Sequence, residues 1–244
     1  ILLMRIFLKT LSCALLTLAF APVFAADENG EIDALESSRT TFSGFGTIGG
    51  VYNSIAKEAG FARTINQGDS TLGQAFSMRP DSRIGVQVNH RLTPELSLTG
   101  QLVLRDQDDN NLNKVISRAF VHWRASPDLR IRFGRFGDAT YLMSDYQDVG
   151  YAYPWARPIE TTYGILPIHH FDGVETSYNL PGEASAWRVK GLIGKINSDI
   201  FLKDDVSYDL QSDGPAFGFA LIREEEASKI WLGYATFKLK KDNE

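Results

Sequence analysis

The sequence predicts an all-β protein, an antiparallel transmembrane β-barrel, and three observations lead to that fold class. From residue 41 onward, segments of about ten residues alternate apolar with polar side chains, which is the period of a β-strand. The connections between these segments alternate between short and long. One face of the segments is almost free of charge, as a lipid-facing surface must be, because Lys or Arg near the bilayer midplane costs about 2–4 kcal/mol.

The composition is compatible with this fold and excludes several others. The chain has 244 residues, of which 43% are apolar and 23% are charged. These averages exclude collagen, a disordered tail and a helical membrane protein, whereas a barrel keeps a soluble-looking average because only one face of each strand is apolar. The 25 Lys and Arg residues are outnumbered by 30 Asp and Glu residues, so nucleic acid is not expected as a partner.

The N-terminal residues have the three parts of a secretory signal peptide. Arg5 and Lys9 form a basic region, residues 11–20 form a short apolar run, and small residues lead up to Ala25. A membrane anchor is the alternative, but the apolar run is short and no stop-transfer charges follow it. We therefore predict a signal peptide over residues 1–25, with cleavage near Ala25.

The chain after the predicted cleavage site divides into two parts. Residues 26–40 are polar and acidic and are expected to form an unstructured leader, and residues 41–244 are expected to form the barrel domain. The single cysteine, Cys13, lies in the predicted signal peptide, so the exported chain would hold no disulfide. Removing Arg5 and Lys9 from the 25 basic residues leaves 23 against 30 acidic residues, a net charge of −7.

Nine segments are expected to form strands. They are residues 41–52, 82–90, 96–105, 114–124, 129–133, 172–180, 186–195, 215–222 and 229–239. Four connections are short, namely 91–95, 125–128, 181–184 and 223–228, and four are longer, namely 53–80, 106–113, 136–171 and 196–214. Short turns at one end and long loops at the other are typical of outer-membrane barrels, whereas a soluble sandwich has no reason to sort its loops in this way.

Three tryptophans give an independent indication of a membrane. Trp123 ends a segment just before a short turn, and Trp187 and Trp231 begin segments just after one. All three are therefore expected at one membrane interface, where an indole ring is half apolar and half hydrated. The polar face of the segments carries mostly Arg, Gln, Ser, Thr, Asn and His, which is suited to a water-filled lumen.

Two stretches carry a resemblance to a known family. They are Phe-Ser-Gly-Phe-Gly-Thr-Ile-Gly-Gly-Val-Tyr (42–52) and Leu-Arg-Ile-Arg-Phe-Gly-Arg-Phe-Gly-Asp (129–138), the second followed by a long loop. In these features the chain resembles the Gram-negative outer-membrane porins. The resemblance implies a channel for passive diffusion of ions and small hydrophilic solutes, embedded in outer-membrane lipid. It also implies a homotrimer, no catalysis and no cofactor.

The resemblance further implies that the long connection at about 136–171 is the third loop, which folds into the lumen and narrows the pore. Porins of this kind have sixteen strands and end in an aromatic residue, whereas this chain shows about nine segments and ends in Lys-Leu-Lys-Lys-Asp-Asn-Glu. Single-chain bacterial barrels have even strand numbers. We therefore interpret the sequence as the N-terminal part of such a barrel, truncated or incomplete at its C-terminus.

The alternation assigns charged residues to the expected pore. The arginines expected to line the lumen are Arg83, Arg105, Arg118, Arg130 and Arg132, with Arg135 facing it only if a bulge re-aims its side chain. The constriction loop is expected to supply Asp138, Asp145, Asp148 and Glu160. A basic wall opposite an acidic loop would set up a transverse field that favours ions and polar solutes. The alternative is that some arginines pair with neighbours near the rim and hold strands together.

Three other functions stay open at this stage. The aromatic residues of the long loop suit a carbohydrate-preferring channel. An outer-membrane hydrolase would need a serine, a histidine and an acid, and Ser117, His122 and Asp128 are the candidates, although no Gly-x-Ser-x-Gly or His-Glu-x-x-His motif is present. A soluble periplasmic β-sandwich that binds a ligand is the third. No metal site is expected, because neighbouring strand residues such as His169 and His170 point to opposite faces.

Overall fold

The computed structural model describes residues 14–18, 39–55, 60–61, 67, 73–106, 112–137, 144–155, 163, 168, 170–181, 186–202, 206–212, 214–225 and 228–238. The strands are β1 (Ala14–Leu18), β2 (Thr40–Tyr52), β3 (Phe76–Ser77), β4 (Arg83–Arg91), β5 (Leu96–Arg105), β6 (Ile116–Arg124), β7 (Leu129–Phe136), β8 (Phe171–Leu180), β9 (Ala186–Lys195), β10 (Asn197–Leu202), β11 (Val206–Gln211), β12 (Ala216–Glu225) and β13 (Ser228–Thr236). The helical elements are the short helix α2 (Leu112–Val115) and the 3₁₀ turn η3 (Gly150–Ala152).

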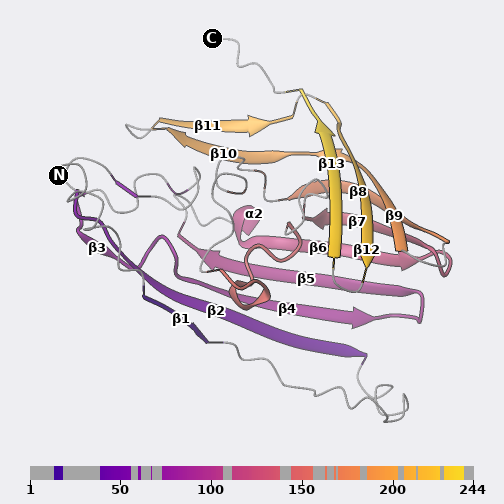
Figure 1. Ribbon diagram of the computed structural model, residues 1–244, viewed down its shortest axis with the longest axis horizontal. Helices are drawn as coiled ribbons and strands as arrows, with labels where there is room; N and C mark the ends of the chain where they lie inside the picture. The colour runs from indigo at the N-terminus through magenta and orange to yellow at the C-terminus, as the bar shows by residue number, and fades with distance from the viewer. Residues whose placement is uncertain are drawn as a thin grey trace.

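One large antiparallel sheet dominates the fold. It has eleven strands in the order β1-β2-β4-β5-β6-β7-β8-β9-β12-β13, with β3 paired to β2, and β10 and β11 form a separate hairpin. The sheet is strongly curved, with β2 to β7 across the lower part of Figure 1 and β8, β9, β12 and β13 turning upward at the right. It is not closed, because β1 and β13 lie at its two ends and no pairing joins them among the described residues.

The nine predicted strands are confirmed, with small changes at their ends. Lys114 and Val115 belong to α2 rather than to the strand that follows, and the strand predicted over 129–133 continues to Phe136. The strands β1, β3, β10 and β11 were not predicted. The all-β antiparallel class is thus correct, whereas the described strands form an open sheet and not a closed barrel. They also form one large sheet and a hairpin, not the two packed sheets that a sandwich requires.

Strand β1 lies inside the segment predicted as a signal peptide. Its residues pair with β2 from Ala14 opposite Gly50 to Leu18 opposite Gly46. The signal peptide stays a prediction, and its removal would take β1 away and leave β2 at the edge of the sheet.

The two faces of the sheet differ in chemistry. A row of directly opposed residues on the outer face crosses six strands and is wholly apolar: Leu98, Val121, Phe133, Val174, Ile193 and Phe217. The outer side chain of Phe133 is 63% exposed, and many other large apolar residues on this face are exposed to a similar degree. On the inner face, polar side chains bond across strands, as where Gln101 Nε2 donates to Gln87 Oε1 at 2.9 Å. The predicted division into a charge-poor face and a polar face is therefore present.

A row of glycines lies where the sheet bends between β7 and β9. Gly134, Gly173 and Gly194 are directly opposite one another on three neighbouring strands. A Cβ at Gly173 would lie 2.2 Å from Ile193 O, and one at Gly134, whose φ is +126°, would lie 2.3 Å from Ala119 O. The backbones therefore approach each other more closely than any other residue type allows.

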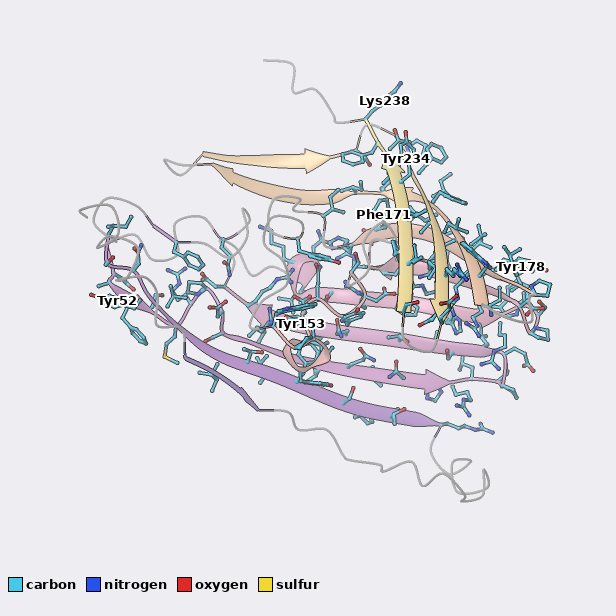
Figure 2. The ribbon with its side chains drawn as sticks, viewed as in Figure 1. Tyr52, Tyr153, Phe171, Tyr178, Tyr234 and Lys238 are labelled. Carbon is cyan, nitrogen blue, oxygen red and sulfur yellow. The ribbon has the colours of Figure 1, made fainter. Side chains whose placement is uncertain are left out.

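A small apolar cluster lies beside this bend on the inner side. It consists of Phe136, Ile168, Phe171, Leu192, Ile196 and Ala216. Phe136 and Phe171 face each other across β7 and β8 and are fully buried. The label of Phe171 in Figure 2 marks this region of the curved sheet. Burial of these side chains stabilises the bend that the glycines permit.

We expect Gly173→Ala to destabilise the sheet and the matched change Gly191→Ala to have little effect. The new Cβ at position 173 meets backbone atoms of β9, whereas a Cβ at Gly191 meets nothing within 4 Å. The free energy of unfolding should fall by about 1–3 kcal/mol for Gly173→Ala and change by no more than about 0.5 kcal/mol for Gly191→Ala. Urea unfolding of the full chain folded in detergent micelles, followed by tryptophan fluorescence, measures both. Equal effects would contradict the tight bend.

Candidate functional site

Part of the long connection between β7 and β8 lies against the inner face of the sheet. This loop segment comprises residues 144–155 and includes η3 (Figure 1). Four arginines on four neighbouring strands reach it: Arg83 on β4, Arg105 on β5, Arg118 on β6 and Arg132 on β7. These contacts make the inner face and the loop segment one polar site.

Asp148 is the most enclosed acid of the loop segment. Arg105 Nη1 donates to Asp148 Oδ1 at 2.6 Å, and Ser117 Oγ donates to Asp148 Oδ2 at 3.3 Å. The side chains of Arg105 and Asp148 are 15% and 8% exposed. Because little water competes for either group, this ion pair is a strong link between the sheet and the loop segment.

A β-bulge gives Ser117 its position. Gln101 of β5 pairs with Arg118, but the next residue, Leu102, pairs with Ile116, so Ser117 is the extra residue of β6. A bulge interrupts the alternation of faces. Ser117 and Arg118 are consecutive and yet both are buried, with their side chains in contact with the loop segment.

Two further arginines hold the loop segment through neutral oxygens. Arg118 Nη2 donates to the carbonyl of Ser144 at 2.5 Å. Arg83 Nη2 donates to the hydroxyl of Tyr153 at 2.8 Å, and that hydroxyl donates to the carbonyl of Gln147 at 3.2 Å. Burial raises the pKa of Tyr153 and the nearby Arg83 only partly counteracts it, so the hydroxyl keeps its proton. Figure 2 shows Tyr153 in front of the middle of the sheet.

Arg132 contacts an acid of the neighbouring strand, an acid of the loop segment and two aromatic rings. Its Nε and Nη2 bond to Glu175 of β8 at 2.9 and 2.7 Å, and its Nη1 bonds to Asp145 of the loop segment at 3.2 Å. The guanidinium also lies 5.3 and 5.1 Å from the ring centres of Phe120 and Phe136, within the range of a cation–π interaction. Arg132 is therefore fixed in place and presents its charge to the loop segment.

Glu175 is a functional residue that the sequence analysis missed. It is 2% exposed, pairs with Arg132 and lies 3.6 Å from Nζ of Lys190. The alternation of faces along β8 places Glu175 on the polar face, but it does not show which residue Glu175 contacts. Only the register, in which Arg132 is directly opposite Glu175, identifies the pair.

Asp145 is held in its ionised form. Its side chain is 45% exposed, so the site removes it only partly from water. That removal by itself would raise the pKa, but Arg132, Lys190 and Arg118 outweigh the effect and lower the pKa below its ordinary value. The carboxylate is therefore charged at neutral pH and attracts the loop segment to the basic inner face.

Arg135 has a different surrounding from the other predicted pore residues. Its Nε and Nη2 both bond to Asp172 at 2.7 Å, its Nη1 donates to the carbonyls of Asn113 and Ile116, and its Nη2 also donates to Asn113 Oδ1. Protein groups thus take up all five donors of the guanidinium. This geometry matches the alternative that a rim arginine holds strands together, here β8 and the α2 turn, and does not favour a pore-lining role.

The remaining predicted site residues fall into two groups. Arg130 lies on the inner face, two residues from Arg132 on the same strand, and is partly buried. Asp138 and Glu160 lie outside the described residues. The pore-lining and constriction roles assigned to the charged residues stay predictions.

The three tryptophans do not share one face of the sheet. Trp123 and Trp187 lie on the outer face, opposite Leu96 and Leu180. Trp231 pairs with the buried Ile222, and Nζ of the inner-face Lys190 lies 5.3 Å from its ring centre. The alternation of β13 (Ser228–Thr236) therefore directs the side chain of Trp231 to the inner face, away from that of the other two. The predicted position of the three tryptophans at one membrane interface stays a prediction.

The residues considered for a hydrolase are not brought together. Ser117 lies near the start of β6, and Asp128 lies in the turn after its other end. The seven residue-to-residue steps from Ser117 to Arg124 alone extend about 23 Å. The described residues also contain no group of three His, Cys, Asp or Glu side chains that could hold a metal ion.

Among the residues that the structure describes, no helix is both long enough and apolar enough to cross a bilayer.

Comparison with protein-family models, curated proteins and solved structures finds no match to this chain.

We expect Asp148→Asn to loosen the loop segment, whereas Asp128→Asn should have little effect. The first change leaves the enclosed Arg105 cation without its carboxylate and should lower the free energy of unfolding by about 3 kcal/mol. The control removes the same charge from an exposed turn residue that makes no ion pair within the described ranges. Urea unfolding and limited proteolysis of the micelle-folded chain measure the two effects. If Asp148→Asn and Asp128→Asn have the same stability and are cleaved equally within residues 144–155, the Arg105–Asp148 ion pair does not hold the loop segment to the sheet.

The stabilisation from Asp145 should depend on pH. Because its pKa is lowered in the folded chain, the contribution is complete above the ordinary Asp value of 3.8 and is lost as pH falls through the lower folded-state pKa. We expect the stability difference between the wild type and Asp145→Asn to be constant from pH 7 to pH 5 and to narrow below pH 3.8. Urea unfolding at each pH measures it, and a gap that narrows already between pH 7 and pH 5 would contradict the assignment.

Proposed function

We propose that this chain forms the wall of an outer-membrane channel of the porin type, which lets ions and small hydrophilic solutes diffuse passively. The observation that carries the proposal is the division of the sheet into an apolar outer face and a charged inner face to which a loop segment is bound. In water an apolar face of this size would be unfavourable. In lipid it is the expected exterior, and the polar face is then the lining of the passage.

The dimensions of the outer face support a membrane setting. The outward residues of β5 run from Leu96 to Leu104, about 26 Å along the strand. At a strand tilt of about 40° this corresponds to about 20 Å along the membrane normal, close to the apolar band of known barrels. Tyr52 and Tyr178, both partly exposed, lie at opposite ends of the sheet in Figure 2, as interfacial aromatic residues do.

Lipid imposes one further requirement on the proposal. Backbone polar groups at bilayer depth need partners, so the open edges of this sheet must pair with other strands in the membrane. Porin-type closure and a homotrimeric assembly are part of the proposal, as is delivery to the outer membrane after cleavage of the predicted signal peptide.

The inner face supports a narrowed and charged passage. Arg83, Arg105, Arg118 and Arg132 project from the sheet, and Asp145 and Asp148 face them from the loop segment. The ion pairs and hydrogen bonds between these arginines and the loop segment hold that segment inside the curve of the sheet. These ion pairs are direct contacts of 2.6 and 3.2 Å, so they narrow the passage by fixing the loop segment in it, and the polar lining that remains would favour hydrophilic over apolar solutes.

Planar-bilayer recording of the full chain tests the proposal. We expect stepwise ion conductance, and larger steps from the double variant Arg105→Gln/Asp148→Asn, because the freed loop segment would no longer narrow the passage. The control Arg223→Gln changes a cation on the outer face, beside Trp187, and should leave the step size unchanged. Absence of conductance steps would overturn the channel, and unchanged steps in the double variant would overturn the narrowing role of the loop segment.

A further inference from the structure

Two arginines of the inner face are directly opposed to each other. Arg124 of β6 pairs in register with Arg130 of β7. Opposed residues of an antiparallel pair have Cβ atoms about 4.5–5.5 Å apart, and like charges in that arrangement destabilise the sheet. Neither guanidinium makes an ion pair or hydrogen bond with another described residue, in contrast to Arg105 and Arg132. We call these two residues the arginine pair.

The surroundings of the arginine pair add positive charge. The same row of the inner face continues through Ser177 to Lys190. In the next row, His122 lies opposite Arg132, and its imidazole is within electrostatic range of Arg124, Arg130 and Arg132.

Two acids of this region are bound to other cations: Glu175 is shared by Arg132 and Lys190, and Asp145 is bound to Arg132. Two more lie close to the arginine pair in the chain. The carbonyl of Glu95 accepts a hydrogen bond from Arg124 N at 2.8 Å, and Asp128 lies in the turn between β6 and β7. Neither carboxylate makes an ion pair with Arg124 or Arg130 among the described residues, so both guanidinium groups keep their donors for a ligand.

We propose that the arginine pair binds an oxyanion, a phosphate or carboxylate group carried by a small solute. Two guanidinium forks on directly opposed residues can each donate two hydrogen bonds to such a group, and a bound anion converts their repulsion into attraction. The pair lies at the short-turn end of the inner face, away from the loop segment. Its place on a channel wall rests on the proposed function, whereas the binding itself does not.

A binding measurement with two simple anions tests the site. The full chain, folded in a neutral detergent at low ionic strength, is titrated calorimetrically with inorganic phosphate and, separately, with acetate. We expect saturable binding of at least one of them at one site per chain. Binding of phosphate alone would assign the site to phosphate groups, and binding of both would support the shared oxyanion chemistry.

The double variant Arg124→Gln/Arg130→Gln should weaken this binding at least about tenfold, because charge-assisted hydrogen bonds are lost. The control Arg79→Gln/Arg223→Gln removes the same charge from two cations that already have the carboxylate partners Asp106 and Glu225. It should leave the affinity within about twofold. Far-UV circular dichroism and the urea midpoint of both variants establish that each is folded.

The outcomes separate this site from the channel. Binding of neither anion, or an equal loss of affinity in the control, would overturn the site even if the chain conducts ions. Saturable binding that only the arginine-pair variant loses would support the site even in the absence of conductance.

Discussion

Guanidinium groups held away from water need acceptors, and this requirement organises the inner side of the protein. Arg83 and Arg118 are each less than one tenth exposed, and Arg105 and Arg132 only slightly more. An unpaired cation in such a position is unfavourable by several kcal/mol. The loop segment supplies carboxylates at Asp145 and Asp148 and neutral oxygens at Ser144 and Tyr153. The arginines therefore hold the loop segment on the concave side of the sheet. The loop segment in turn supplies the acceptors without which the buried arginines would destabilise the fold.

This arrangement depends on the curvature of the sheet. A flat sheet would point the side chains of β4 to β9 in parallel, whereas a curved one makes them converge. The glycines at 134, 173 and 194 allow the backbones of β7, β8 and β9 to approach closely at the bend. The buried pair of Phe136 and Phe171 then occupies the concave side next to them. Arg132 touches both parts, since its guanidinium lies against Phe136 and also binds Asp145.

The arginines of the sheet thus differ in what they can do. Arg105, Arg132 and Arg135 are neutralised by carboxylates and serve mainly to hold the loop segment or neighbouring strands. Arg124 and Arg130 have no such partner in the described part of the chain, so their charge is available to a solute. Counting arginines in the sequence does not separate the two kinds, because the distinction depends on which acids reach them.

The sequence by itself determined the nine main strands, the sorting of short and long connections and the difference between the two faces, because each follows from local alternation and turn residues. The tertiary structure alone decided the partners: Glu175 for Arg132, Asp148 for Arg105, and Asp172 with α2 for Arg135. It also placed Ser117 in a bulge and turned Trp231 inward. The reason is physical, since alternation along one strand assigns a residue to a face, whereas contacts across strands depend on register, bulges and curvature, which are set by the packing of the whole sheet.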